Sequence, residues 1–433
     1  MKRKGYSLLF AAVLVWTVVL SGCSGGSEAG NESGSEKMIQ FMHLWPAGSS
    51  KHHNMIVKDI IEQFESKHPG VHVEVEVLEN EQYKNKMKIL SSSNQLPDVG
   101  FTWAAGYLNP FVEGKLFAPL DDVLDDGLKD EFVSGTTEAY EVDGQTYGLP
   151  LELNIAPIYY NKKIFKENNL EVPETYKEFK NVVKTLESEG VTPIALGNKD
   201  RWTGSLWYMY LADRLGGPKM LNKAIDRSGS FEDSAFVSAA DEIQKLVKAN
   251  AFNKGFNGLS NDEAKSQFLN EKAAMYLMGT WELPNFTTNE EIPQEFRDNV
   301  GYFKFPTVEG GKSDINSWVG GPGVGLFVAQ NSKVKDESKE FAEFFVEKWG
   351  DQAVTKAGVI PATKVDTGEV ELPQLYIDIL DDLNQSSNLT LFADVQMSSS
   401  VAETHLNLIQ SLFGNEVQPK DFAKRHEEAL QKE

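Results

Sequence analysis

The strongest constraint on the fold is an alternation of strand-like and helix-like segments near the start of the folded region. Residues 38–44 form an apolar run typical of a buried strand, and residues 55–64 place apolar side chains on one helical face. Residues 71–77 alternate valine with polar side chains, residues 81–92 suit a polar helix, and residues 97–101 predict a turn into a short strand. This order predicts an α/β domain built on a mainly parallel sheet.

Later segments continue the mixture of strands and helices. Asp143-Gly144, between two tyrosines, predicts a tight hairpin turn. Thr175 and Glu178 have the spacing of a capping box that opens a helix ending near residue 189. Mainly helical sequence is expected over 200–290 and from 332 onward, with further strands at 156–160, 273–277, 302–305 and 323–328.

The N-terminus has the pattern of a bacterial export signal. A basic start at residues 2–4 precedes an apolar run at 8–20, which is shorter than the roughly 20 residues that a spanning helix needs. The run ends in Leu20-Ser21-Gly22-Cys23, which resembles a lipobox: small residues suit a peptidase site, and the cysteine can accept lipid. The alternative is an uncleaved anchor with a chance cysteine.

The segment after the signal suits a tether. Residues 24–36 are almost all Gly, Ser, Glu, Asn and Ala, a composition that cannot bury a core. We therefore expect a signal peptide at 1–22, a lipid on Cys23 and a flexible tether at 23–37. This would place the protein outside the cytoplasm, held to the cell membrane by its lipid alone.

Charge and cysteine usage narrow the possible partners. The only cysteine is Cys23, so the folded body has no disulfide and no Cys-based metal site. The formal charge is −22, and loss of the three basic residues of the signal would bring the mature chain to about −25. Such a body should be repelled by nucleic acid, whereas neutral ligands are unaffected. At roughly 150 residues per domain, the length suggests two or three domains.

Motifs for catalysis and metal binding are missing. The sequence has no His-Glu-x-x-His, no Gly-x-Ser-x-Gly and no phosphate-binding loop. His52-His53 is the only histidine pair, and the acidic residues at 121–126 lack the spacing of a calcium loop. We expect no catalytic residue, no metal and no cofactor. A carboxylate pair for glycoside hydrolysis stays open among 64 acidic residues, but no pair stands out.

Tryptophans at predicted strand–loop junctions are the chemical feature that remains. In open α/β sheets, ligands lie beyond the carboxyl ends of the strands, and flat aromatic rings there suit the C–H faces of sugars. Core packing explains any single tryptophan equally well, but a position shared by several of them favours a binding site. They are Trp45, Trp103, Trp202, Trp207, Trp281 and Trp318.

Several motifs resemble the extracellular solute-binding proteins of ABC sugar importers, the family that includes the maltodextrin-binding protein. The most specific stretch runs from Tyr147-Gly148-Leu149-Pro150 through Ile158-Tyr159-Tyr160-Asn161-Lys162 to Pro173-Glu174-Thr175-Tyr176. Leu96-Pro97-Asp98-Val99 and Ala274 to Trp281 agree as well. Tyr176 departs from the pattern, since the family more often has tryptophan there, which should affect only helix packing.

The resemblance implies an α/β, two-lobed periplasmic-binding-protein-like fold of type II, with a hinge crossed more than once and closing on ligand. It implies crossings near 152–156 and 318–323. Lobe 1 would comprise residues 38–154 plus 322–354, and lobe 2 residues 155–321 plus 355–433.

The resemblance also implies a ligand site and partners. Trp103 and Trp281 match aromatic ligand contacts best, while Asp98 is expected either to contact ligand or to cap the following turn. The expected ligand is a di- or oligosaccharide, the expected partners are the membrane subunits of an ABC permease, and a monomer is expected. A glycerophosphodiester or a polyamine is an alternative ligand, and a secreted glycoside-degrading enzyme is an alternative function. The remaining expected contacts are Trp45, Glu152, Asn154, Trp202, Trp318 and Gly320.

Overall fold

A computed structural model describes residues 36–125, 127–364 and 371–432. The expected signal peptide, Cys23 and nearly all of the expected tether lie outside these residues. No helix in the described part of the chain combines the length and apolar character needed to cross a membrane.

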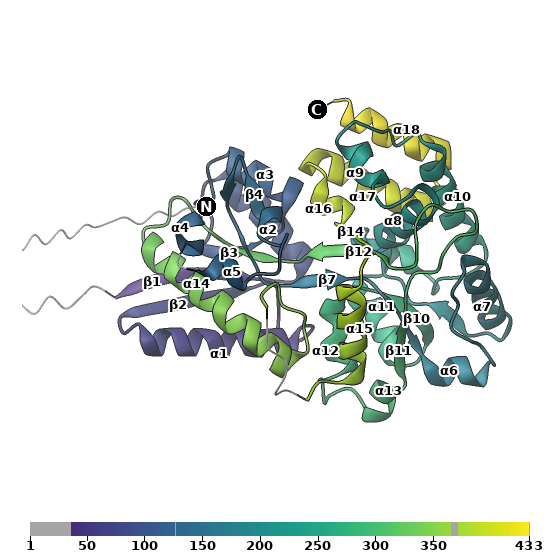
Figure 1. Cartoon of the computed structure of the whole chain (residues 1–433), viewed down its shortest axis with the longest axis horizontal. Helices are drawn as coiled ribbons and strands as arrows, with labels where there is room; N and C mark the ends of the chain where they lie inside the picture. Colours follow the sequence, from purple (N-terminus) through teal and green to yellow (C-terminus); the bar gives the residue numbers. More distant parts are fainter. Residues whose placement is uncertain (1–35, 126, 365–370, 433) are drawn as a thin grey trace, which may run out of the picture. The chain divides into compact units, whose positions relative to one another are not determined.

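The first sheet has the strand order β2-β1-β3-β13-β6. Figure 1 labels β1, β2 and β3 of this sheet. Its parallel part is β1 (Lys37–His43), β2 (Val71–Val77) and β3 (Val99–Thr102), with α1 (Lys51–Lys67) and α2 (Asn80–Ser92) as the connecting helices. These five elements confirm the alternation predicted from the sequence. The sheet is completed by β13 (Gly325–Val328), which is antiparallel to both β3 and β6 (Leu149–Pro150).

The second sheet has the order β11-β8-β10-β9. β8 (Ile158–Asn161) is antiparallel to β10 (Ala273–Leu277) and to β11 (Val300–Phe303), while β9 (Thr192–Ile194) is parallel to β10. All five residues of β10 are buried, which explains why the sequence shows a continuous apolar run there.

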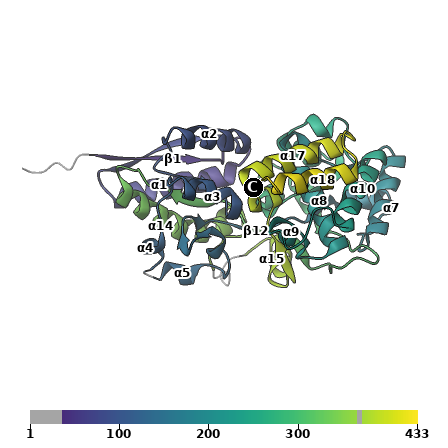
Figure 2. The same cartoon turned by 90° about the horizontal axis from the view of Figure 1, so that it is seen from above.

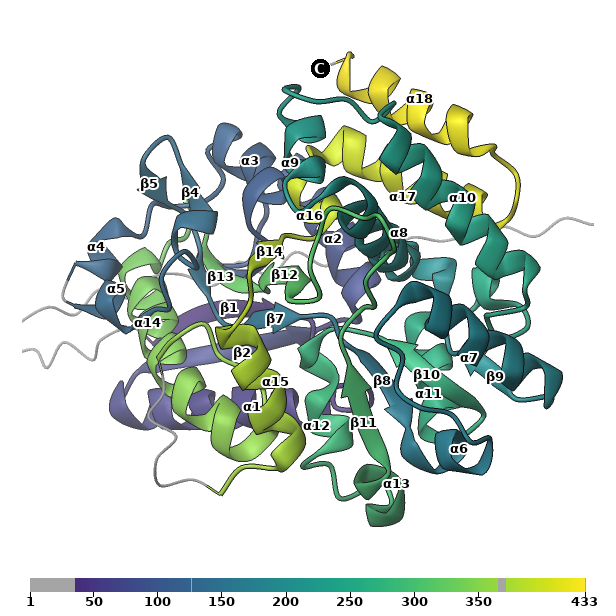
Figure 3. The ribbon, with the colours of Figure 1, turned by 45° about the vertical axis from the view of Figure 1, so that its right-hand side comes forward.

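A third, three-stranded sheet lies on the passages between these two sheets. β7 (Leu153–Ile155) leads from β6 to β8, and β12 (Ser317–Pro322) leads back from β11 to β13. The two strands pair antiparallel, and β14 (Asn388–Thr390) pairs parallel to β12 (Figure 3). A further bridge joins Glu152 to Pro361. We call the five-stranded sheet with its helices lobe 1, and the four-stranded sheet with its helices lobe 2.

Helices cover both lobes. In lobe 1, α14 (Lys335–Gln352) packs against α1 and β13, and in lobe 2 the final helices α17 (Ser399–Phe413) and α18 (Pro419–Leu430) pack on α8 (Trp202–Gly216) and α10 (Ser234–Lys248) (Figure 2). The remaining α-helices are α3 (Ala105–Glu113), α4 (Asp121–Leu124), α5 (Leu128–Glu131), α6 (Lys162–Glu167), α7 (Tyr176–Ser188), α9 (Met220–Ile225), α11 (Asn261–Leu269), α12 (Leu283–Phe286), α13 (Gln294–Asp298), α15 (Gln374–Asn384) and α16 (Ala393–Gln396).

Local chemistry sets the turns and caps as the sequence predicts. Asp143 and Gly144 both have positive φ, 51° and 79°, and join β4 (Glu141–Val142) to β5 (Gln145–Thr146) in a hairpin. Thr175 and Glu178 form both bonds of the capping box at the start of α7.

Candidate functional site

A cavity of about 490 Å³ is lined by segments from both lobes and from the third sheet. Lobe 1 contributes the loop after β1, the start of α2 and Trp103 after β3. Lobe 2 contributes the start of α8, the start of α11 and Trp281, while α16 adds Asp394. The volume falls within the range of small-molecule sites, about 300–1,000 Å³.

Three aromatic rings form one continuous wall of the cavity. The ring centroid of Trp281 lies 6.0 Å from that of Trp202 and 5.8 Å from that of Phe392, with interplanar angles of 66° and 65°. The rings therefore meet edge to face and form an apolar trough. Trp281 and Trp202 are only half-buried, so part of each ring is open to a ligand.

Trp202 is held in place by an unusual backbone at Arg201. Arg201 has φ 67°, which costs energy for a side chain other than glycine. Its guanidinium compensates by donating to Glu403 at 2.7 Å and to Asn407 at 2.8 Å, both on α17. This strained residue separates Asp200 from Trp202 and lets both line the cavity.

Trp103 also lines the cavity, and its ring packs against a second aromatic ring. Its ring centroid lies 4.9 Å from that of Tyr107, edge to face. The Lys84 ammonium lies 4.7 Å from the Trp103 centroid, 3.8 Å from Glu81 and 3.7 Å from Asp394. Lys84 therefore covers one part of the Trp103 ring and connects α2 with α16 electrostatically.

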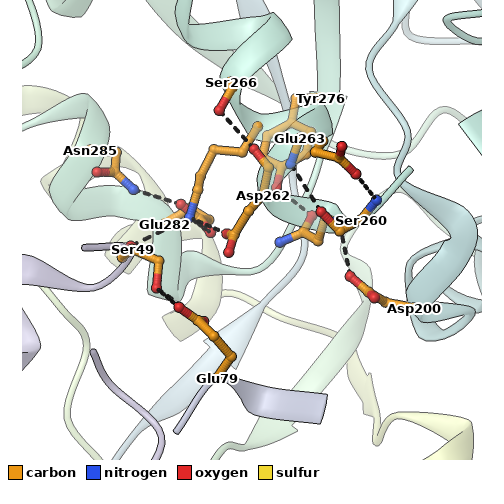
Figure 4. A network of polar contacts seen from close by, with 12 residues as sticks. Ser49, Glu79, Asp200, Ser260, Asp262, Glu263, Ser266, Tyr276, Glu282 and Asn285 are labelled. Atoms are coloured by element: carbon orange, nitrogen blue, oxygen red, sulfur yellow. Dashed lines mark hydrogen bonds and ion pairs between the residues drawn. The ribbon is translucent and has the colours of Figure 1, made fainter. Parts of the chain in front are cut away.

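A buried lysine organises the polar wall, and Figure 4 labels its neighbours Ser49, Asp262 and Glu282. The Lys265 ammonium lies 2.9 Å from Asp262 and 3.3 Å from Glu282, and it reaches the Ser49 carbonyl of lobe 1 at 3.5 Å. Burial alone would lower the pKa of Lys265, but these two carboxylates outweigh it and raise that pKa above its usual value. Asn285 donates to the other oxygen of Glu282 at 2.6 Å.

Three carboxylates of the cavity are partly desolvated. Burial is the main cause that raises the pKa of Glu79, Glu81 and Asp200 above the usual values. Glu79 accepts from the Ser49 hydroxyl at 3.0 Å, and Asp200 accepts from the Asn261 amide at 2.7 Å. Such oxygens keep free lone pairs that can accept hydrogen bonds from a ligand.

Residues of the third sheet supply the buried polar floor. Glu152 is 3% exposed and Asn154 is 1% exposed, and both line the cavity. Asn154 donates to Glu152 at 3.2 Å, and the other oxygen of Glu152 lies 3.2 Å from His53 Nε2. The Thr280 hydroxyl donates to the Asn154 carbonyl oxygen at 2.8 Å.

The structure brings together six of the nine residues predicted as ligand contacts. The six lie on the cavity wall: Trp45, Trp103, Glu152, Asn154, Trp202 and Trp281. Trp45 is largely buried, because it stacks on Trp349 at 4.5 Å.

The other three predicted contacts do not line the cavity. Asp98 instead accepts a hydrogen bond from the Gln40 amide at 2.9 Å and so ties β3 to β1. Trp318 is 1% exposed within β12, where its neighbours pair with β14 and β7. Gly320 pairs with Ile155, and a side chain there would clash with the Asn154 backbone. Trp318 and Gly320 therefore lie in a strand, where the sequence predicted a binding loop.

Several residues that line the cavity were not predicted from the sequence. Lys84 and Lys265 look like ordinary surface lysines of polar helices, and Phe392 and Asp394 lie more than 100 residues beyond Trp281. The histidine pair in the sequence raised only metal binding as a role for His53. Among the described residues, no group of three or more His, Cys, Asp or Glu could hold a metal ion.

Comparisons with known proteins show the family and the fold. A family profile described as bacterial extracellular solute-binding protein matches residues 54–348. The multiple sugar-binding protein of Streptococcus mutans is 27% identical over 355 residues, covering 78% of this chain and 77% of that protein.

Solved structures share the fold. A structure from work on xylan utilization by the thermophilic bacterium Caldanaerobius polysaccharolyticus is 34% identical, with a TM-score of 0.85 and coverage of 90% of this chain and 99% of that one. A chitin oligosaccharide binding protein has the same TM-score of 0.85 at 22% identity, covering 92% of this chain and 99% of that one, and shows likeness of fold alone. The two-lobed α/β fold expected from the sequence is thereby confirmed.

Proposed function

The chain belongs to the family of bacterial extracellular solute-binding proteins, and from this premise we propose that it captures a di- or oligosaccharide in the cavity between its lobes and delivers it to an ABC permease. The observation that carries the proposal is the trough of Trp202, Trp281 and Phe392 facing a wall of hydrogen-bonding carboxylates. Sugars present apolar C–H faces and hydroxyl donors in the same molecule, so they suit both walls at once.

The charges of the cavity support a neutral ligand. Each carboxylate on the wall already has a partner inside the protein: Glu79 with Ser49, Glu81 and Asp394 with Lys84, Glu152 with His53, Asp200 with Asn261, and Asp262 and Glu282 with Lys265. At Glu81, Asp394, Asp262 and Glu282, a polyamine would have to compete with Lys84 or Lys265 for the same oxygens. A hydroxyl needs only a free lone pair, which each carboxylate retains.

A phosphodiester ligand fits the cavity less well. Bidentate arginine contacts are the usual way to hold a phosphate, and the cavity wall contains no arginine among the described residues. Arg201, the nearest in sequence, is engaged with Glu403 and Asn407. Lys84 and Lys265 lie between carboxylates, which would repel a phosphate.

The proposal includes three expectations from the sequence. Residues 38–154 plus 322–354 would move as one lobe and residues 155–321 plus 355–433 as the other, closing about β7 and β12. Cys23 would carry a lipid that anchors the protein on the outer face of the cell membrane. The protein would act as a monomer. It would not change its ligand chemically, because its sequence has no recognised catalytic motif.

A ligand screen tests the proposal. The folded chain is titrated with xylotriose, maltotriose, tri-N-acetylchitotriose and galactobiose, with spermidine and glycerophosphocholine as non-sugar controls. A true ligand raises the melting temperature because it binds only the folded state. We expect at least one sugar to raise the melting temperature, and we expect that sugar to remain intact after long incubation. A shift with the non-sugars alone, or release of sugar products, would overturn the proposal.

The xylan-derived sugar is tested first. The 34% identical structure comes from work on xylan utilization, while relatives below 30% identity carry the names multiple sugar-binding, maltotriose-binding and galactooligosaccharide-binding protein. The panel therefore includes the kinds of sugar that the names of these relatives indicate, and its sugars differ in length and linkage.

A further inference from the structure

We propose that His53, Glu152, Asn154 and Thr280 form a buried positioning relay that links lobe 1 to lobe 2 and sets the orientation of Trp281. The inference rests on the proposed function, since Trp281 is taken as a ligand-stacking ring. It assigns Glu152 and Asn154 a positioning role through Thr280, where the sequence predicted direct ligand contact.

The relay crosses from one lobe to the other through the third sheet. His53 is on α1 of lobe 1, Glu152 directly precedes β7, Asn154 lies within β7, and Thr280 follows β10 of lobe 2. These four residues are 4%, 3%, 1% and 0% exposed. Water therefore has little access to these polar groups, and each depends on its partner in the chain.

The partners of the Thr280 hydroxyl set the hydrogen-bond directions from Thr280 to Glu152. The Thr280 hydroxyl accepts from the Ile155 amide at 3.3 Å, so its single proton points to the Asn154 carbonyl oxygen at 2.8 Å. The Asn154 amide nitrogen must then face Glu152, at 3.2 Å. The other oxygen of the Glu152 carboxylate lies 3.2 Å from His53 Nε2, which completes the relay on the side of lobe 1.

The far end of the relay bears on Trp281. Thr280 and Trp281 are consecutive residues of one 3-10 turn (Thr280–Glu282). The Trp281 ring folds back over Gly279, where a Cβ would lie only 2.1 Å from the ring. Glu282 on the other side is held by Lys265 and Asn285. The ring therefore sits between two anchored neighbours, one of them the relay.

The near end bears on the aromatic wall of lobe 1. The His53 ring lies 4.8 Å from that of Trp45, and Trp45 stacks on Trp349. Both His53 and Trp45 line the cavity. The relay thus couples a cavity wall in one lobe to the stacking ring in the other. Thr280 itself does not line the cavity, so we expect a break at Thr280 to weaken binding without removing a ligand contact.

Matched substitutions at Thr280 test the relay. Thr280→Val keeps the shape but removes the hydroxyl, whereas Thr280→Ser keeps the hydroxyl. We expect about tenfold weaker sugar binding for Thr280→Val, the usual effect of a lost bond in a buried network, and near wild-type binding for Thr280→Ser. Thr287→Val, which removes a 2.7 Å bond to Leu283 outside the cavity wall, is the control.

Binding is measured by calorimetric titration with xylotriose, or with the panel sugar that gives the largest wild-type shift. Tryptophan fluorescence is recorded in the same samples, since a displaced Trp281 should change the emission spectrum of Thr280→Val but not that of Thr280→Ser or Thr287→Val. If Thr280→Val binds as tightly as Thr280→Ser with the same spectrum, the relay is wrong. If wild-type protein binds no sugar of the panel, the proposed function fails instead.

A second set of variants guards against misfolding at Thr280. Glu152→Gln and Asn154→Asp keep size but break the donor–acceptor order of the relay. Each is expected to weaken binding, and the double variant Glu152→Gln/Thr280→Val should lose no more than the worse single one, because the relay is already broken. Fully additive losses would contradict a shared relay.

Discussion

At the scale of single residues, Trp281 is the point where most cavity features converge. Its ring touches Trp202 and Phe392, lies over Gly279, and follows the anchored Thr280. It is half-buried rather than part of the core. A residue of this kind contributes to ligand binding far more than to folding.

Trp281→Ala should therefore abolish the ligand-induced rise in melting temperature while leaving the unliganded protein folded. Truncation of a central aromatic anchor costs about 2 kcal/mol or more of binding free energy. The check is a thermal-shift series with the best panel sugar, with circular dichroism of the unliganded variant as the control. Wild-type affinity in Trp281→Ala would mean that the ligand lies elsewhere.

Buried histidines should make the protein sensitive to acid. Burial lowers the pKa of His43 to about 4, with a smaller effect from Lys58, and burial likewise lowers the pKa of His426 to about 4. His426 Nδ1 must carry the proton it shares with the Phe422 carbonyl at 2.8 Å, so its Nε2 accepts from His405. Because their pKa values are lowered to about 4, the imidazoles of His43 and His426 are neutral in the folded protein at pH 7.

The unfolded chain binds protons at these histidines near pH 6.5, while the folded chain does so only near pH 4. Stability contributed by the neutral form is present above pH 6.5 and is lost as the pH falls toward 4. Urea unfolding at pH 7 and pH 5 should show a loss of about 2 kcal/mol for each such histidine. An unfolding free energy that does not change between pH 7 and pH 5 would contradict this assignment.

At the scale of elements, the capping box of α7 shows how local chemistry supports the lobe without touching the site. Thr175 and Glu178 satisfy backbone amides at the start of the helix, and the helix buries Phe179, Val182 and Leu186. None of these residues lines the cavity. Stability and binding are therefore separable in this helix.

Thr175→Ala should lower the free energy of unfolding by about 1 kcal/mol, the usual cost of losing an N-cap. Sugar affinity should stay at the wild-type value. Ser188→Ala at the other end of α7, where the exposed hydroxyl bonds only to Thr185, is the matched control. Equal destabilisation of both variants in urea would show that the cap itself is not responsible.

At the scale of the whole molecule, the formal charge of −22 distinguishes the possible ligands. A neutral sugar does not respond to this field, whereas a polyamine is attracted by it over a distance that salt shortens. In the cavity, Lys84 and Lys265 already pair with Glu81, Asp394, Asp262 and Glu282.

Affinity for a sugar should therefore hardly change between low salt and about 0.5 M sodium chloride, where exposed charges are screened within a few ångströms. Titration of the same protein with spermidine provides the contrast, since any binding of a polyamine should weaken steeply over this range. A steep salt dependence for the bound sugar would indicate that charge, rather than stacking and hydroxyl contacts, holds the ligand.

The sequence by itself determined the elements whose cause is local. The alternation from β1 to β3, the Asp143-Gly144 turn, the capping box of α7 and the buried run of β10 all follow from periodicity and backbone chemistry over a few residues. The motifs around Tyr147 to Tyr176 were enough to identify the family. The tryptophans Trp103, Trp202 and Trp281 could be predicted as cavity residues because each follows a strand or opens a helix.

Only the tertiary structure decided which polar residues meet at the site. Lys84, Lys265, Asp394 and Phe392 come from helices far apart in the chain, and the spacing of charges along a helix does not reveal a partner on another element. Trp318 could not be separated in advance from the true cavity residues, because burial in a central strand and exposure at a cleft leave the same apolar signal. Strand pairing across the passages, set by long-range contacts, made that choice.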